Sequence, residues 1–172
     1  MEVKIEELQA KEVDFFWPVF SQIIKTGFPG YSSAVVDYFL SKIYTPQAFK
    51  QWLATGWKSI LVAKKKAMIV GFAVLDKPYG GVSFCRWLAV VENSRRQGIG
   101  RKLISSWLAL AKEKGCHKLE IASQPEAKDF YQQIGLELEG KRSLSYFAID
   151  QFIFGKVIGR PSDQAMTKDW QN

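Results

Sequence analysis

The chain has 172 residues, 47% of them hydrophobic and 24% charged, and carries a net charge of +7 at pH 7. These fractions are typical of a globular protein and exclude a disordered one, and the length suits one domain with a sizeable core. No apolar run approaches the ~20 residues of a membrane span, and the charged stretch from Met1 to Glu7 is unlike a signal peptide, so we expect a cytoplasmic protein with no membrane partner.

A strand and a helix are predicted at the start of the chain. Val3 and Ile5 alternate with charged residues, which is typical of a short strand at a sheet edge. From about residue 10 to residue 25 apolar side chains recur at helical spacing, with Pro18 inside the pattern. Because proline lacks a backbone donor and clashes with the preceding turn, the helix is expected to start or to kink at Pro18.

Capping residues predict two shorter helices. Ser32 or Ser33 is expected to cap a helix that continues to Ile43. Thr45 precedes Pro46, which is the usual order of a capping residue and a first helical residue, so a further helix should begin there.

The segment from Phe28 to Trp57 is rich in aromatic residues. These side chains either pack against a sheet or, in the case of Phe28 and Tyr31, form the wall of a substrate pocket. The sequence leaves both interpretations open.

Three antiparallel strands are predicted next, over 59–63, 67–75 and 82–91. Lys64, Lys65 and Lys66 form a tight turn that joins the first two strands into a hairpin. The stretch 68–74 is apolar on both faces, so the sheet is expected to be covered on both sides.

A glycine loop follows the third strand and opens a helix that ends at Gly115. The helix start offers free backbone N–H groups and the positive end of the helix dipole, and Gly98 and Gly100 leave space for a ligand. Because arginines flank these glycines, the geometry suits a phosphate-bearing ligand, but the six-residue pattern in isolation fits a plain glycine turn with solvated arginines equally well. Leu103 stands where a dinucleotide fingerprint needs its third glycine, and a P-loop would need Lys-Ser or Lys-Thr after Gly100.

A strand over 117–122 follows the helix, and this order predicts a parallel pair with a right-handed crossover. Ligands in such sheets lie beyond the carboxyl ends of the strands, so residues after Val90 and after Ala122 should face one site. A short helix then ends at Gly135, and further strands are expected over 136–140 and 143–157.

The basic residues are scattered in short groups, without the aromatic-interleaved stripe expected of a nucleic-acid surface, so nucleic acid is disfavoured and an anionic cofactor favoured. Cys85 and Cys116 are too few for a disulfide framework and are expected to be inert core thiols. The single histidine, His117, has no partner at ligand spacing, so no metal site is predicted.

Two motifs resemble those of the GNAT N-acetyltransferase superfamily. Arg95-x-x-Gly98-x-Gly100 is similar to its acetyl-CoA pyrophosphate loop, Gln/Arg-x-x-Gly-x-Gly/Ala. The stretch 124–136 resembles the family pattern Asn-x-x-Ala-x-x-Phe-Tyr-x-x-x-Gly-Phe, which it matches at Ala127, Phe130, Tyr131 and Gly135. It departs from that pattern by having Gln124 for asparagine and Leu136 for phenylalanine.

The resemblance covers about residues 59–157 and implies an α/β (α+β) fold. Its mixed, mostly antiparallel central sheet has helices on both faces and one parallel strand pair that opens onto the CoA site. We expect one domain over 1–158 and a mobile tail over 159–172, in which Trp170 is the one candidate anchor.

The resemblance also implies how the cofactor acetyl-CoA is held. Leu88, Ala89 and Val90 should offer backbone groups to the pantetheine arm, and Gln124 should hold that arm as well. The loop residues expected around the pyrophosphate are Arg95, Arg96, Gln97, Gly98, Ile99, Gly100 and Arg101.

The same resemblance implies that Tyr131 is the general acid that meets the leaving sulfur. The family often places a basic glutamate on the strand before the loop or on the strand after it, or uses a water chain. Here the earlier strand carries Arg86, so Glu120 on the later strand is the candidate base, unless it is simply a solvent-facing residue.

We therefore predict an acetyl-CoA-dependent N-acetyltransferase that acts by direct attack of a primary amine of a small molecule, protein or peptide. A non-catalytic CoA-binding module and a basic nucleic-acid-binding domain are the alternatives. The sequence leaves open the acceptor, the length of the acyl chain and the oligomeric state, including a homodimer.

Overall fold

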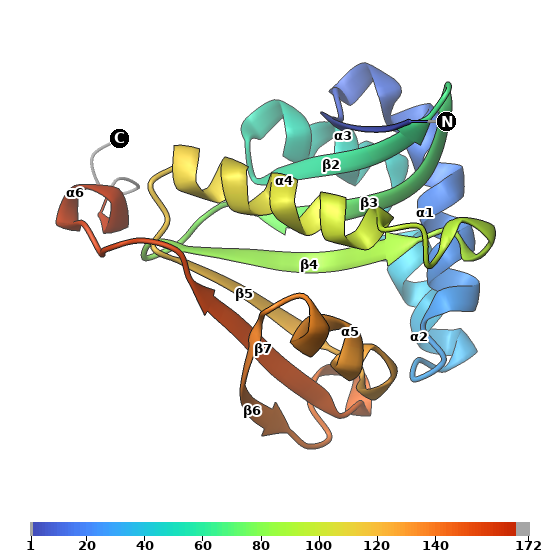
Figure 1. Ribbon diagram of the computed structural model, residues 1–172. Helices are drawn as coiled ribbons and strands as arrows, with labels where there is room; N and C mark the ends of the chain where they lie inside the picture. Colours follow the sequence, from blue (N-terminus) through green and yellow to red (C-terminus); the bar gives the residue numbers. More distant parts are fainter. Residues whose placement is uncertain (1, 168–172) are drawn as a thin grey trace.

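The computed structural model describes residues 2–167. Its strands form one seven-stranded sheet in the order β1-β2-β3-β4-β5-β7-β6 (Figure 1). Its strands are β1 (Val3–Glu7), β2 (Lys58–Lys65), β3 (Met68–Asp76), β4 (Val82–Val90), β5 (Lys118–Ser123), β6 (Glu137–Arg142) and β7 (Gln151–Val157). Neighbouring strands are antiparallel except β4 and β5, which are parallel. The mixed, mostly antiparallel sheet predicted from the sequence is therefore confirmed.

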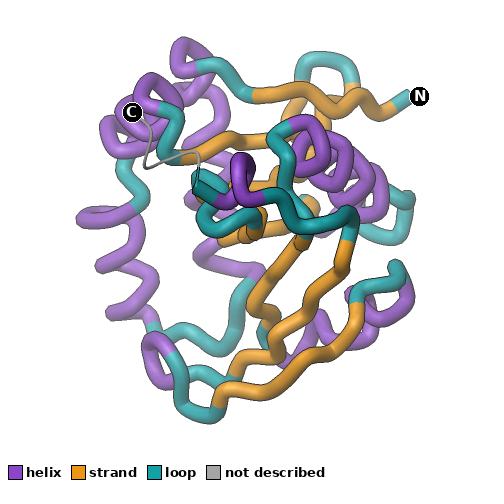
Figure 2. The backbone as a smooth tube through the Cα atoms, turned by 90° about the vertical axis from the view of Figure 1, so that its left-hand side faces the viewer, coloured by secondary structure: helices purple, strands orange, loops and turns teal. Residues whose placement is uncertain are grey.

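Helices lie on both sides of the strands (Figure 2). They are α1 (Val13–Gly27), α2 (Ser33–Tyr38), α3 (Pro46–Thr55), α4 (Ile99–Glu113), α5 (Lys128–Gln133) and α6 (Asp163–Met166). Successive residues of β3 pack into two separate hydrophobic cores, one on each face of the sheet. Phe72 packs with Phe16 and Phe20 of α1, whereas Ala73 belongs to the cluster around Leu103 and Trp107 of α4. The prediction that both faces of the sheet are covered is confirmed.

The predicted capping residues lie at the starts of α2 and α3. The Ser32 hydroxyl accepts a hydrogen bond from Val35 N (3.3 Å), and the Thr45 hydroxyl accepts one from Ala48 N (3.2 Å). The expected start of a helix at Pro18 is wrong, because α1 begins at Val13 and runs through the proline. Pro18 is exposed, so water can bond the backbone carbonyl that loses its helical partner.

The strand predicted over 143–157 is also wrong in its first half, because β7 begins only at Gln151. Residues 143–150 form a turn in which Leu144, Phe147 and Ala148 have φ values of 45°, 60° and 59°. A left-handed backbone cannot continue a strand. The carboxylate of Asp150 accepts a hydrogen bond from Leu144 N (3.0 Å) and holds the turn closed.

The two parallel strands separate partway along their length. Their pairing runs from Val82 with Lys118 to Cys85 with Ile121, and beyond that point β4 and β5 diverge (Figure 1). Helix α4 is fixed to the paired part of β4 by a buried hydrogen bond from Trp107 Nε1 to Ser83 Oγ (2.8 Å). The open edge of β4 and the start of α4 therefore face one space.

The last described residues contain the short helix α6. A Cβ on Gly115 would contact Ala165, so this helix lies against the turn after α4. The mobility of the tail stays a prediction, and Trp170 lies outside the described residues. Over residues 2–167 we find no helix long and apolar enough to cross a membrane.

Candidate functional site

The start of α4 forms one wall of a hollow of about 740 Å³, which we call the loop hollow. Gly98 (φ 76°) and Arg96 (φ 59°) turn the chain into the helix through left-handed conformations. Lys102 N donates the first hydrogen bond, to Gly98 O (3.1 Å), so the N–H groups of the preceding three residues remain for a ligand. A Cβ on Gly98 would meet no atom within 4 Å, so the space beside this residue is open.

Most of the residues predicted to bind the cofactor line the loop hollow. They are Leu88, Ala89, Val90, Arg95, Arg96, Gly98, Ile99, Gly100 and Arg101. Arg95 is also tied to the strand, because its Nε donates to Val90 O (3.1 Å). Gln97 is not among the lining residues. Its side chain amide donates to Asn93 O (3.3 Å) and accepts from Lys65 Nζ (3.5 Å).

A second hollow, of about 220 Å³, lies where β4 and β5 diverge, and we call it the aromatic hollow. Phe28 and Tyr31 line it, as the sequence suggested for a substrate pocket. Further aromatic residues that the sequence did not single out complete its walls: Phe39, Tyr44, Phe84, Trp87, Tyr146 and Phe147. Gln124 lines this hollow and not the loop hollow.

The two hollows meet at residues that line both of them: Gly27, Phe28, Leu88, Glu126, Ala127 and Tyr131. Tyr131 is 4% exposed, and its ring packs against those of Phe130 and Phe154. Burial is the largest cause that raises the pKa of Tyr131 above its ordinary value. The phenol therefore stays protonated at neutral pH at the junction of the hollows.

Several buried polar atoms in the wall of the aromatic hollow have no hydrogen-bond partner among the described residues. They are Trp87 Nε1, Gln124 Nε2 and Gln151 Oε1. Burial raises the pKa of Tyr31 and of Tyr44, and the neighbouring Gln124 and Trp87 offset this only in part. The indole Nε1–H of Trp87 and the amide Nε2 of Gln124 nonetheless make no hydrogen bond within the described residues. Unpaired polar atoms in an apolar wall are positions where a ligand can bond.

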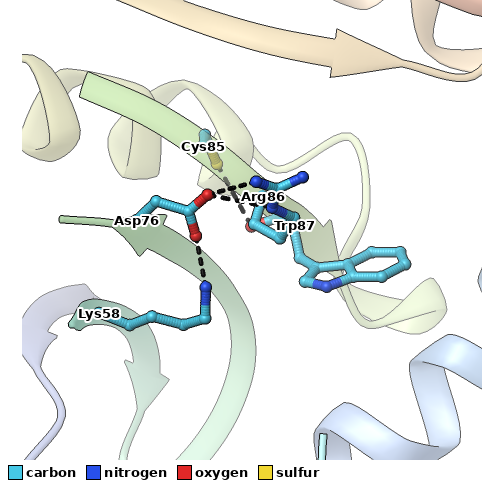
Figure 3. Close-up of polar contacts among 5 residues, drawn as sticks. All are labelled: Lys58, Asp76, Cys85, Arg86 and Trp87. Atoms are coloured by element: carbon cyan, nitrogen blue, oxygen red, sulfur yellow. Dashed lines mark hydrogen bonds and ion pairs between the residues drawn. The ribbon is translucent and has the colours of Figure 1, made fainter. Parts of the chain in front are cut away.

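Arg86 is the cation in the wall of the aromatic hollow. Its guanidinium donates to Asp76 Oδ2 through Nε (3.1 Å) and Nη2 (2.5 Å), while Lys58 Nζ donates to Asp76 Oδ1 (2.5 Å) (Figure 3). Burial works against the charge of the guanidinium, but Asp76 raises the pKa of Arg86. The site therefore holds a permanent positive charge.

The candidate base Glu120 lies outside both hollows. Its carboxylate is 3.7 Å from Lys118 Nζ, and that ammonium is bonded more closely to Glu139 (2.6 Å). Glu126 is the carboxylate that the described residues bring to the junction. The sequence held one signal for it, namely its place directly before Ala127 in the second motif.

Both cysteines are buried, and burial raises the pKa of each thiol. Cys85 donates its S–H to Trp87 O (3.3 Å). No group of three or more metal-ligating side chains occurs in the part of the chain that the structure describes.

A sequence model described as "Acetyltransferase (GNAT) domain" matches residues 28–143. The structure is similar to the PaiA N-acetyltransferase of Thermoplasma acidophilum in complex with coenzyme A, with a TM-score of 0.79, 17% identity and coverage of 91% of this chain and 99% of that one. It also resembles a GNAT-family acetyltransferase of Streptococcus pneumoniae (TM-score 0.74, 19% identity, coverage 92% and 100%). An N-acetyltransferase of Staphylococcus aureus Mu50 is similar too (TM-score 0.72, 16% identity, coverage 92% and 99%). At these identities the likeness establishes the fold. No curated protein matches the sequence.

Proposed function

Because this chain belongs to the GNAT acetyltransferase family, it is an acyltransferase, and we propose that it moves the acetyl group of acetyl-CoA to a primary amine. The amine attacks the thioester directly, so that an N–C bond forms, the C–S bond breaks and the amine loses a proton. The observation that carries this proposal is the meeting of the two hollows at Tyr131. A donor held in one hollow and an acceptor held in the other can react there.

The loop hollow has the chemistry that a CoA molecule needs. The free N–H groups at the start of α4 and the side chains of Arg95, Arg96 and Arg101 suit the pyrophosphate. Beyond Cys85 the edge of β4 that faces β5 has no strand partner within residues 2–167, so its backbone can bond the amide groups of the pantetheine arm. This supports the assignment of Leu88, Ala89 and Val90 to cofactor binding.

Tyr131 is proposed as the donor to the leaving sulfur. An ordinary thiol has a pKa of about 8.5 and an ordinary phenol about 10, and burial raises the phenol further. Full proton transfer from Tyr131 to the thiolate is therefore uphill. We assign to its hydroxyl a hydrogen bond to the sulfur, which strengthens as negative charge develops there.

Glu126 is better placed than Glu120 to receive the proton of the amine, directly or through a water molecule. It borders both hollows, whereas Glu120 is near Lys118 and lines neither hollow. The proposed base is therefore Glu126, and Gln124 is assigned to the acceptor side rather than to the CoA arm.

Two measurements test this function. Calorimetry should show saturable binding of acetyl-CoA, and a panel of primary amines should include some that release free thiol from acetyl-CoA. Mass spectrometry of the product should then place the acetyl group on nitrogen. Binding of acetyl-CoA without thiol release from any amine would instead identify a non-catalytic CoA-binding module.

A further inference from the structure

Arg86 lies at the end of the aromatic hollow that is remote from the loop hollow. It precedes Leu88 on β4 by two residues and lines only the aromatic hollow, whereas Leu88 borders both. At about 3.3 Å per strand residue, the two Cα positions are roughly 7 Å apart. The guanidinium carbon lies 4.6 Å from the centre of the Phe84 ring, so the charge points back along the strand, away from the junction.

The charge at this end of the hollow is not neutralised. The Asp76 carboxylate is divided between Arg86 and Lys58, so two cations share one anion (Figure 3). Lys58 is largely buried, with 15% of its side chain exposed, whereas 42% of the Arg86 side chain is exposed. The unshared positive charge therefore faces the hollow through Arg86.

The opposite end of the same hollow carries the opposite charge. Among the described residues that line the aromatic hollow, Arg86 and Glu126 are the charged ones. Glu126 borders the junction with the loop hollow, where the amine must react. An acceptor in this hollow thus has its ammonium end near a carboxylate and its other end near a guanidinium.

The wall between the two charges is aromatic, and one of its polar atoms can only donate. Trp87 is 6% exposed, and its indole Nε1–H has no hydrogen-bond partner among the described residues. An indole N–H cannot accept a hydrogen bond, so it fits an oxygen of the ligand. Arg86 therefore offers charged donors to an anionic group of the ligand, and Trp87 adds a neutral donor in the wall of the same hollow.

Resting on the proposed function, the geometry points to an acceptor that is a primary amine with a carboxylate at the far end of an apolar body. Arg86 binds the carboxylate and determines specificity, and the aromatic wall binds the body. A polyamine is disfavoured, because its second ammonium group would face the guanidinium.

The test compares para-(aminomethyl)benzoate with para-(aminomethyl)benzamide, which keeps the size and the amine but removes the negative charge. We expect the native protein to acetylate the acid with a kcat/KM roughly 10- to 100-fold higher than the amide, as a charged hydrogen bond warrants. Arg86→Gln should abolish this preference. Arg160→Gln, which removes an exposed arginine outside both hollows, should retain it.

A second variant separates binding of the ligand from support of the ion pair. If Arg86 served only to hold Asp76, Asp76→Asn would lose the preference as Arg86→Gln does. If Arg86 instead binds the carboxylate of the acceptor, Asp76→Asn releases its guanidinium from the ion pair. This variant should then keep or increase the preference for the acid. Asp76→Asn also carries the test if Arg86→Gln does not fold.

Binding measurements distinguish failure of this inference from failure of the proposed function. Calorimetry on the protein saturated with CoA should show the acid binding at least tenfold more tightly than the amide, and equal binding in Arg86→Gln. This outcome without acetylation of any amine would overturn the proposed function but would still support binding of the carboxylate by Arg86. Equal binding of acid and amide to the native protein would overturn the anchor.

Discussion

Gly100 and Phe130 bring the two sequence motifs into direct contact. A Cβ on Gly100 would lie 2.8 Å from the Cζ atom of the Phe130 ring, closer than real Cβ atoms approach another atom. The glycine is therefore needed for close packing of α4 against α5 and not for its backbone angle, which is helical. The contact fixes the start of α4 relative to the helix that carries Tyr131.

Gly100→Ala should destabilise the protein by about 1 to 3 kcal/mol, because the methyl group must displace the ring of Phe130. Alanine is otherwise the better helix residue, so a loss of stability would identify the clash. Urea unfolding measures it. The double variant Gly100→Ala with Phe130→Leu should recover part of the loss, as expected for two residues in contact. Strictly additive effects of the two substitutions would contradict this contact.

Gly98, in contrast, is predicted to leave space for the ligand. Gly98→Glu should abolish binding of acetyl-CoA, because the side chain enters the open space beside the helix start and brings a negative charge to the pyrophosphate position. Gly56→Glu is a matched control, since Gly56 has a similar φ of 71°, an equally open surrounding and no place in either hollow. Both variants should lose a similar stability, of the order of 1 kcal/mol. Unchanged CoA affinity in a folded Gly98→Glu protein would show that this loop does not bind the cofactor.

The sequence predicted the sheet and the loop because both depend on short-range patterns. Ser32 and Thr45 bond backbone groups three residues away, and the strand–helix–strand order around Gly98 determines a parallel pair. By contrast, the turn over 143–150 has residues in the left-handed conformation, and it contains no glycine that would have indicated this conformation in the sequence. No local pattern in this segment predicted that backbone.

The aromatic hollow was only partly predictable, because its wall comes from distant parts of the chain. Trp87 on β4 and Phe147 in the turn before β7 both line it, and neither is marked by a motif. The choice between Glu120 and Glu126 shows the same limit. Both glutamates are close to the second motif in the sequence. Only the folded chain shows that Glu120 is near Lys118 and that Glu126 lines the loop hollow together with Tyr131.

Stability should fall in alkaline solution because Cys85 stays protonated in the folded protein. Burial and, second, the charge of Asp76 raise the pKa of this thiol, whereas the unfolded thiol has a pKa of about 8.5. Below that pH both states hold the proton. Above it only the folded state does, so each further pH unit removes up to ~1.4 kcal/mol of the free energy of unfolding.

The measurement is urea unfolding at pH 7 and pH 10 of the native protein and of Cys85→Ala. The native protein should lose about 2 kcal/mol more than the variant over this interval, since only it contains the thiol. The comparison at pH 7 accounts for the cavity that the substitution leaves. An equal loss in both proteins would show that other groups cause the alkaline destabilisation.

Tyr131→Phe should lower kcat by about 10- to 100-fold, the value of one hydrogen bond to a charged sulfur. The affinity for acetyl-CoA should change little, because phenylalanine keeps the packing of the ring against Phe154. Free-thiol release under conditions where chemistry limits the rate measures the effect, and Tyr79→Phe, at an exposed tyrosine that lines neither hollow, is the control. Because the pKa of Tyr131 is raised, the contribution of this residue should also persist unchanged from pH 7 to pH 9.5. A kcat within threefold of the native value would exclude Tyr131 as the donor, and the thiolate would then leave with the help of water alone.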